Sequence, residues 1–360
     1  MIPILFPADF IYTGTPANGL GRLPDCKSCV ITEERNGEYT LEMEYPLDGL
    51  HADELAAQKI IMALAGEKTG LQCFRIVRIK PNMKTISVYA NHVSYDLSYY
   101  PVAPFSFSGG PGVRVLAYIN KIWENQVNAA DFNVSAEDVG AYPIPTSWGT
   151  DVPVSTMAML GREEDSILSS FGGEFEWDNW TVKWSSARGT DNGVTISYGK
   201  NLMSFEQETN IAETVCGLLP YWSGSGTTVV GDPQYSSNAS SFPFMKVKPY
   251  DFSSLISSQP TKSDLNFAGS VYVTKLNIGV PEVSTEIEFY PLWQTPEYEK
   301  FAALEKVGLC DTVTVNFPAL NVHAKAKVVK TIFNTLLERY ESITLGSVKQ
   351  NLADTIAALM

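Results

Sequence analysis

Histidine is scarce in this chain, and its scarcity argues against several kinds of catalysis. Only three histidines occur among 360 residues, namely His51, His92 and His323, and they lie in three separate segments. None has the spacing of a HExxH motif or of another metal-binding pair. We therefore expect structural or surface histidines, with His92 placed on a strand by the alternation around it.

Cysteine is also sparse, with five residues at Cys26, Cys29, Cys73, Cys216 and Cys310. An odd number spread thinly along the chain argues against a disulfide framework. Cys26 and Cys29 have the spacing of a redox motif or of half a zinc site, but no second such pair follows. We expect both to be small apolar residues that lead into a strand. Cys73 and Cys216 lie in apolar segments, where burial raises the thiol pKa and quiets the thiol.

Familiar enzyme motifs are missing as well. The sequence has no GxSxG motif, no P-loop and no dinucleotide-binding glycine pattern next to a strand. Paired carboxylates drawn from distant positions, as in glycosidases, are left open by the sequence. We predict no catalytic residue, no cofactor-binding residue, no metal site and no cofactor.

Positive charge and long apolar runs are in short supply. Lys and Arg number 26 against 40 Asp and Glu, which gives a formal net charge of −14. Such a chain is a poor nucleic-acid binder, because phosphate contacts need basic side chains, although an acidic surface suits DNA that slides past. No run of 18 apolar residues and no signal peptide is present. We expect a protein that folds in a reducing cytoplasm.

What the chain does have is aromatic residues and turns. It holds 17 Tyr, 17 Phe, 7 Trp, 26 Gly and 21 Pro, which predicts a β-rich fold of two to four domains. The clearest hairpin is Val30–Gly49, where Asn36-Gly37 is a type I′ turn signal and Tyr39–Pro46 alternates apolar with polar residues. A short helix or turn is expected at 50–59 and strands at 60–66 and 71–97, so that 1–105 forms an antiparallel β domain.

Two helices are expected after the boundary at 101–112. The segment 113–127 has an apolar stripe at helical spacing. The segment 162–173 is a shorter helix with Glu163, Glu164 and Asp165 in its first turn and a glycine pair at its end.

The stretch Gly172–Leu202 contains three tryptophans and several acids. An Asp178-Asn179 turn would pair Trp177 with Trp180 and Glu174 with Lys183, placing the aromatic residues on one face and the acids on a solvated face. The alternative is a carbohydrate platform built from Trp177, Trp180 and Trp184. Alternation explains every residue, so we favour the structural interpretation.

The C-terminal half mixes loops, strands and helices. We expect a flexible loop at 222–243, helices at 261–277 and 295–304, strands at 284–293 and 311–317, and a final helix. The segments 74–97 and 326–346 both read as strand, tight turn and strand, which would suit two similar β domains.

Several motifs resemble one known family. "VITEERNGEYTLEMEYPLDGLHADEL", "LQCFRIVRI", "VYANHVSYDLS", "GGEFEWDNWTVKWSSARGTDNGVTISYGKNL" and "LLERYESITLGSVKQNLADTI" occur in the order seen in phage tail proteins. The family is the N-terminal hub region of the tail-associated lysin (Tal), or prophage endopeptidase tail, proteins of Gram-positive siphophages. The similarity covers essentially the whole chain.

This resemblance implies a baseplate-hub-like α+β fold with two β-barrel-like domains and two smaller α/β insertions. The expected boundaries are 1–105 for the first barrel, completed by about 190–215, and 106–189 for an α/β insertion. A second barrel would span 216–345, with a helical insertion near 255–305 and a C-terminal helix at 346–360. Relatives often have glycine where this chain has Cys310, so that turn is expected to differ in backbone.

The resemblance further implies a virion protein at the tail tip, assembled in the bacterial host cytoplasm. It would form a homotrimer that closes the tail tube, adapts its symmetry and opens for DNA during infection. Its partners would be the distal tail protein, the tail tube, the tape-measure protein, a spike, fibre or receptor-binding protein, and the host cell envelope. Longer relatives carry a hydrolase domain after the hub, and no catalytic position carries over to this chain. The rival hypotheses are a peptidoglycan hydrolase or endopeptidase and a carbohydrate-binding adhesin.

Overall fold

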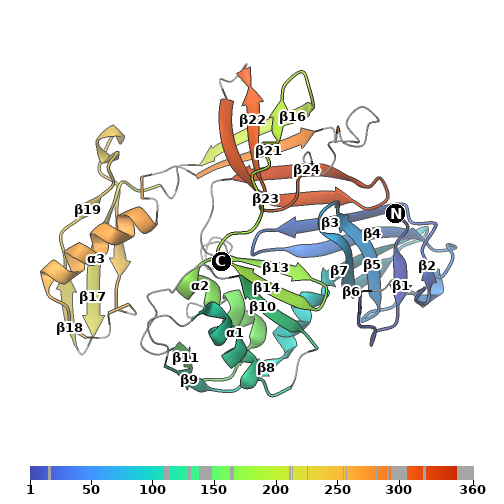
Figure 1. Ribbon diagram of the computed structural model, residues 1–360, viewed down its shortest axis with the longest axis horizontal. Coiled ribbons are helices and arrows are strands. Elements are labelled where there is room, and N and C mark those ends of the chain that lie inside the picture. Colours follow the sequence, from blue (N-terminus) through green and yellow to red (C-terminus); the bar gives the residue numbers. More distant parts are fainter. Residues whose placement is uncertain are drawn as a thin grey trace. The chain divides into compact units, whose positions relative to one another are not determined.

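The chain folds into two compact units with several β-sheets (Figure 1). One unit comprises Met1–Glu206 and Thr285–Met360, and the other comprises Gln207–Ser284. The computed structural model describes residues 1–14, 18–108, 114–128, 131–137, 148–162, 166–210, 212, 214–224, 226–253, 255–256, 258–276, 278–279, 282–289, 292, 306–318 and 322–346. The predicted β-rich α+β class is confirmed.

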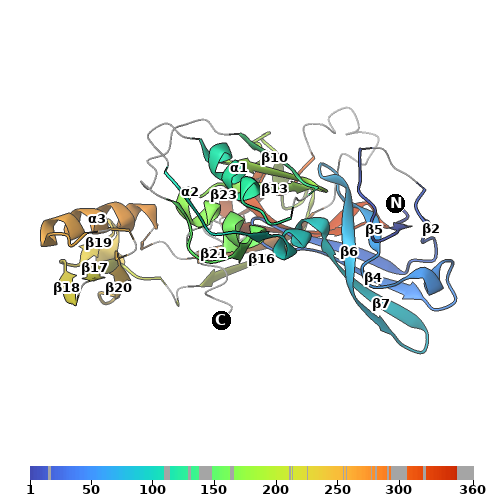
Figure 2. The same cartoon turned by 90° about the horizontal axis from the view of Figure 1, so that it is seen from below.

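The first part of the large unit is a run of antiparallel strands. From one side to the other these are β3 (Ser28–Glu34), β4 (Tyr39–Pro46), β7 (Thr85–His92), β6 (Gly70–Pro81), β5 (Ile60–Gly66), β1 (Ile4–Phe6) and β2 (Gly21–Arg22). Figure 2 shows β4, β6 and β7 running alongside one another. Alternation along β4 buries Tyr39, Leu41, Met43 and Tyr45 as predicted, and these residues join one core cluster.

The long strand β23 (Val322–Asn334) belongs to both parts of this unit. Its first half pairs with β22 (Thr312–Phe317), and its second half pairs with β3 from Lys330↔Glu34 to Asn334↔Val30. On its other side β23 pairs with β24 (Arg339–Gly346). In Figure 1 the orange-red β23 therefore lies beside both the blue β3 and the red β24. The hydroxyl of Thr335, just past β23, donates to the Leu64 carbonyl of β5 at 2.8 Å.

The second part continues the same sheet. Beyond β24 lie β21 (Glu282–Phe289) and β16 (Leu202–Asn210), whereas β15 (Thr195–Ser197) pairs in parallel with β22. The two ends of this run, β15 and β16, are consecutive in sequence and meet at a bridge between Tyr198 and Leu202. The core of this second part is a separate cluster of buried side chains, which includes Ile196, Ile287, Val313, Val328 and Ile343.

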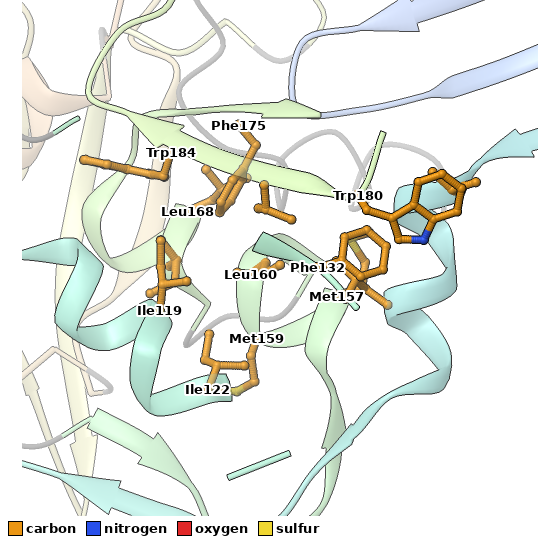
Figure 3. Packing of buried hydrophobic residues seen from close by; sticks show 14 of the residues in the cluster. Ile119, Ile122, Phe132, Met157, Met159, Leu160, Leu168, Phe175, Trp180 and Trp184 are labelled. Carbon is orange, nitrogen blue, oxygen red and sulfur yellow. The ribbon is translucent and has the colours of Figure 1, made fainter. Parts of the chain in front are cut away.

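A segment of helices and a β-hairpin packs on one face of the first sheet, opposite the face that buries Tyr39, Leu41, Met43 and Tyr45. It contains α1 (Val115–Glu124), α2 (Ile167–Phe171), and a three-stranded sheet of β10 (Asn133–Glu137), β14 (Thr181–Ser185) and β13 (Glu174–Asp178). Figure 3 shows Phe175 and Trp184 of the hairpin gathered with Leu168 of α2 and Ile119 and Ile122 of α1. Short elements complete it: β8 (Pro101–Val102), β9 (Phe105–Phe107), β11 (Trp148–Thr150), β12 (Val154–Ser155), a π-helical turn at Ala158–Arg162, and a 3-10 turn at Val93–Tyr99. A further 3-10 turn, Ala52–Glu54, lies between β4 and β5 and packs Ala52 into the core of the first sheet.

The small unit has its own core. Strand β17 (Gly217–Gly224) lies between β20 (Val247–Asp251) on one side and β18 (Thr227–Val230) with β19 (Gln234–Tyr235) on the other, and a 3-10 turn covers Ala239–Ser241. Helix α3 (Lys262–Lys275) lies against β17 and β19 (Figure 1). A Cβ on Gly269 would come within 3.0 Å of Pro220 Cγ, so glycine permits this close approach.

Several local predictions prove wrong. The stretch expected as a loop at 222–243 contains the end of β17, all of β18 and β19, and a 3-10 turn. Strands β17 and β18 pair from Tyr221↔Val230 to Gly224↔Thr227 beside Gly226, which has φ +76°. The Asn36-Gly37 connection is longer than a two-residue turn. Only Asn36 has positive φ, and the flanking pair is Glu33↔Tyr39. Since Asn36 also bonds Gly173 and Phe175, tertiary contacts override the local turn signal.

The helical predictions fare better. Both 113–127 and 261–277 contain the expected helix, as α1 and α3. The 162–173 segment contains α2, but the helix begins after a Ser166 cap and no acid lies in its first turn. Its end at Gly172, with φ +67°, is as predicted. Positions 163–165, the expected helix at 295–304 and the final helix at 346–360 lie outside the described residues, apart from Gly346, which ends β24.

A buried charged junction as the candidate functional site

The carboxylate of Glu174 joins three segments of the large unit that are distant in sequence. It is the first residue of β13 and is 4% exposed. Lys327 Nζ of β23 lies 2.6 Å from both carboxylate oxygens, and Arg35 Nη1, just after β3, donates to Oε1 at 3.1 Å. The backbone N–H of Arg188 donates to Oε2 at 2.5 Å. The hairpin is thereby tied to both parts of the large sheet.

Burial and bonding act in opposite directions on Glu174. Burial alone would raise the pKa of its carboxyl, but hydrogen bonds from Lys327 and the Arg188 N–H hold that pKa below its ordinary value. The prediction that the hairpin acids form a solvated face is therefore wrong for Glu174. It holds for Glu176, whose side chain is 44% exposed.

A second buried acid lies close by. Glu33 of β3 is 3% exposed, and Arg188 Nη2 lies 3.7 Å from its Oε1. Burial raises the pKa of Glu33, and the Arg188 guanidinium only partly offsets that effect. Arg188 Nη1 also donates to the Phe175 carbonyl at 2.7 Å. This arginine therefore spans β3 and the hairpin.

Asp311 makes a comparable junction at the start of β22. Its carboxylate accepts from Lys68 Nζ at 2.6 Å, from the Gly308 N–H at 2.7 Å and from the Thr190 N–H at 2.9 Å. The neighbouring Cys310 has φ +70°, which is the left-handed backbone that glycine favours. Cys310 therefore adopts a backbone conformation that glycine would also favour at this turn.

A neutral network fixes the tip of the β13–β14 hairpin. The fully buried Gln72 accepts at Oε1 from the Asn179 N–H at 2.8 Å, and its Nε2 donates to Asp178 Oδ1 at 3.0 Å. His92 Nε2 lies 3.1 Å from the same Gln72 oxygen, and its Nδ1 lies 3.3 Å from the Ser94 N–H. The Gln72 oxygen can only accept and the Ser94 N–H can only donate. His92 Nε2 therefore carries the proton, Nδ1 accepts, and the ring is neutral.

His92 is therefore a structural histidine at the end of β7. Burial lowers its pKa to about 3, so it stays uncharged. His51 is partly exposed and lies 2.7 Å from Glu54 Oε1. His323 lies on β23, and its side chain is outside the described part. Among the described residues, no group of three or more His, Cys, Asp or Glu side chains is arranged to hold a metal ion.

The cysteines and tryptophans also have structural surroundings. Burial raises the pKa of the Cys73 thiol, and raises that of Cys310 to about 12. Trp180 is 6% exposed and Trp184 is fully buried, so the three tryptophans do not form an exposed carbohydrate platform. Trp177 is partly buried and packs against two core clusters.

The sequence did not reveal the basic members of this junction. Arg35 and Arg188 lie within stretches that resemble the tail family, but nothing in those stretches names their partners, which come from distant segments, as does the partner of Lys327. One signal was present, because lysines recur inside the apolar strand segment "VHAKAKVVK". A lysine that alternates into a sheet needs an acid beside it, although the sequence does not say which. The arrangement holds segments together and presents no open reactive group among the described residues.

Three solved structures with a similar fold are tail proteins. The prophage tail protein gp18 from Listeria monocytogenes EGD-e matches with a TM-score of 0.62 and 12% identity, over 100% of this chain and 98% of that one. The 43 kDa tail protein of prophage MuSo2 from Shewanella oneidensis matches with a TM-score of 0.61 and 10% identity, over 97% and 99% of the chains. The tail protein from Neisseria meningitidis MC58 gives 0.59 and 9%, over 98% of both. The fold is thus that of the prophage tail proteins.

Part of the sequence also matches one family model. Residues 190–356 match the family model described as the prophage endopeptidase tail. The predicted resemblance to prophage tail proteins is thereby confirmed. A comparison with curated proteins finds no match. Within the described residues, no helix has both the length and the apolar character needed to cross a membrane.

Proposed function

We propose that this chain is a structural hub protein at the tip of a bacteriophage or prophage tail. The observation that carries the proposal is the match of its whole fold to prophage tail proteins, over nearly all of each chain. The buried charges support it, because they join β3, β23 and the β13–β14 hairpin. Such contacts suit a rigid assembly part.

The first and second parts of the large unit are the proposed pair of barrel-like domains. In the first, Thr335 brings the end of β23 to β5. In the second, the outer strands β15 and β16 meet at Tyr198 and Leu202. Three copies would then present six similar domains around an axis. A ring of this kind would close a sixfold tail tube and carry a spike, fibre or receptor-binding protein below it.

The ring would open for the tape-measure protein and DNA during infection. The net charge of −14 suits a passage that repels the phosphate backbone. We therefore expect no measurable binding of duplex DNA by the purified protein, even at low salt, in a fluorescence polarisation titration. Tight, salt-sensitive binding would contradict the proposed passage.

The oligomeric state and activity of the purified protein test the hub role. Light scattering after size-exclusion chromatography should give three times the 39.6 kDa of one chain. Pull-down with the distal tail protein of the same phage should retain the protein. A chain that stays monomeric at every concentration, and does not bind that partner, would overturn the proposal.

The rival is a peptidoglycan hydrolase, since the matched family carries endopeptidase in its description. Dye release from labelled cell walls distinguishes the two, with hen lysozyme as a positive control. We expect release no greater than with buffer alone. Release that rises in proportion to protein concentration would establish the hydrolase instead.

A further inference from the structure

Cys26 and Cys29 lie together at the entrance to β3. Cys29 is the second residue of that strand and is fully buried, whereas Cys26 lies in the preceding turn and is partly exposed. Both side chains pack against the same core cluster. The spacing of the pair was a weak signal in the sequence, and the structure adds that the Cys26 thiol lies against the peptide carbonyl that joins Ser28 to Cys29.

The contacts of Cys26 hold its thiol in this position. Its Sγ donates to the Ser28 carbonyl at 3.1 Å and lies 3.9 Å from the Glu44 carbonyl of β4. The neighbouring Cys26 thiol and burial together raise the pKa of the Cys29 thiol. The turn is fixed independently, because Asp25 Oδ2 accepts from the Leu50 N–H at 2.8 Å.

We propose that Cys26 and Cys29 form a reversible disulfide when the protein meets an oxidising small disulfide such as glutathione disulfide. The proposal does not depend on the role in a tail. It assigns a modification site to a pair of residues that the buried charged junction does not use. Disulfides persist only in oxidising surroundings, so the bond would report that the protein has left a reducing compartment.

The exchange proceeds in two balanced steps. Cys26, the exposed partner, loses its proton and attacks one sulfur of glutathione disulfide, which forms a mixed disulfide and releases one glutathione that takes up the proton. The Cys29 sulfur then attacks Cys26 Sγ, and the second glutathione leaves with the Cys29 proton. The two protein thiols are oxidised, and one glutathione disulfide is reduced to two glutathiones.

The order of attack follows from exposure. Only Cys26 can be reached by a solute, while the buried Cys29 is placed to resolve the mixed disulfide. Because the thiolate is the reactive form, the raised pKa of Cys29 slows its attack on the mixed disulfide.

A peptide map gives a direct test, since Lys27 lies between the two cysteines. Trypsin cuts after Arg22, Lys27 and Arg35, which separates the peptides Leu23–Lys27 and Ser28–Arg35. Protein treated with glutathione disulfide, then alkylated and digested, should yield these two peptides joined and lighter by two hydrogens. Added reductant should separate them. The count of free thiols in denaturant should fall from five to three.

Two variants complete the test. Cys26→Ser should keep all four of its thiols and give no joined peptide. Cys73→Ser, which changes a buried cysteine on β6, should still form the bond, so its thiol count should fall from four to two. The proposal is overturned if five thiols remain in the treated protein. It is equally overturned if Cys26 stops at the glutathione adduct or links to Cys26 of a second copy.

Discussion

Single residues matter in this chain chiefly through the buried charges that they neutralise. Glu174 has two cationic partners, Lys327 and Arg35, whose side chains are 13% and 5% exposed. A buried pair adds little net stability when complete, but removing one member leaves the other charge uncompensated. The cost of a substitution here therefore depends on which charge is left behind.

Replacing Glu174 by Gln should destabilise the protein by about 3–5 kcal/mol, because the buried ammonium of Lys327 then loses the carboxylate that lies 2.6 Å from it. Urea unfolding followed by tryptophan fluorescence measures the change. The matched control is Glu176→Gln on the same strand, whose partner Lys183 is 3.9 Å away and partly exposed. That control should cost less than about 1 kcal/mol. Equal losses of unfolding free energy in both variants would show that the buried charged junction does not contribute more stability than an exposed ion pair.

The same residue gives the stability a pH dependence with a definite sign. Because the pKa of Glu174 is lowered by folding, its contribution is complete above its unfolded pKa and is lost as pH falls through the folded pKa. The difference in unfolding free energy between the natural protein and Glu174→Gln should therefore shrink as the solution is acidified below about pH 4.5. A difference that stays constant to pH 3 would show that the carboxylate charge is not involved.

Gly189 lies where backbone and space both demand glycine. It has φ +78°, and a Cβ there would come within 2.1 Å of the Cys310 carbonyl oxygen. Gly189→Ala should thus cost well over 2 kcal/mol in thermal or urea unfolding, since strain and a backbone clash add. Gly193→Ala is the control, with φ +73° but nothing within 4 Å of the added Cβ. It should cost only the strain, about 1–2 kcal/mol.

Elements were easier to foresee than their pairing. Alternation correctly put Phe175, Trp177 and Val182 on one face of the hairpin. The observed register pairs Trp177 with Val182 rather than with Trp180, and the turn lies at Asn179 and Trp180. A shift of two residues keeps every side chain on its face, so the sequence pattern cannot detect it. Contacts of Asn179 with Gln72 and Leu71 decide the register.

Helix α3 depends on its first turn, because few of its residues are buried. The Thr261 hydroxyl accepts from the Asp264 N–H, and the Asp264 side chain accepts from the Thr261 N–H. Thr261→Ala should therefore destabilise the small unit by about 1 kcal/mol in hydrogen exchange of α3 amides. Ser263→Ala, an exposed change in the same turn, should leave exchange unchanged or slightly slower. Equal effects of the two substitutions on exchange would show that the Thr261 cap does not stabilise α3.

At the scale of the molecule, the sequence predicts fold class through resemblance but misses how the parts connect. The repeated pattern at 74–97 and 326–346 does correspond to two hairpins, β6–β7 and β23–β24, each with a bulge. Nothing in the strand pattern shows that β23 pairs with β3, because that pairing joins residues about 300 positions apart in sequence. The domain boundaries given above remain predictions.

The shared strand predicts that the large unit unfolds as one. Ile343 of β24 is fully buried in the core cluster of the second part of the large unit. Ile343→Ala should lower the free energy of unfolding by about 2–5 kcal/mol. Hydrogen exchange of β4 amides, in the first part, should speed up by the matching factor. Val271→Ala on the exposed side of α3 is the control and should leave β4 unaffected. If the β4 amides of Ile343→Ala stayed as protected as in the natural protein, the two parts of the large unit would unfold independently.

The continuity of β23 also has a mechanical consequence. A load placed on the second part of the large unit reaches the first along covalent backbone, not only across side-chain contacts. Pulling the two apart would have to shear the ladder between Lys330–Asn334 and Val30–Glu34, in which many hydrogen bonds share the force at once. In the proposed assembly role, this continuity would make the large unit stiff along β23.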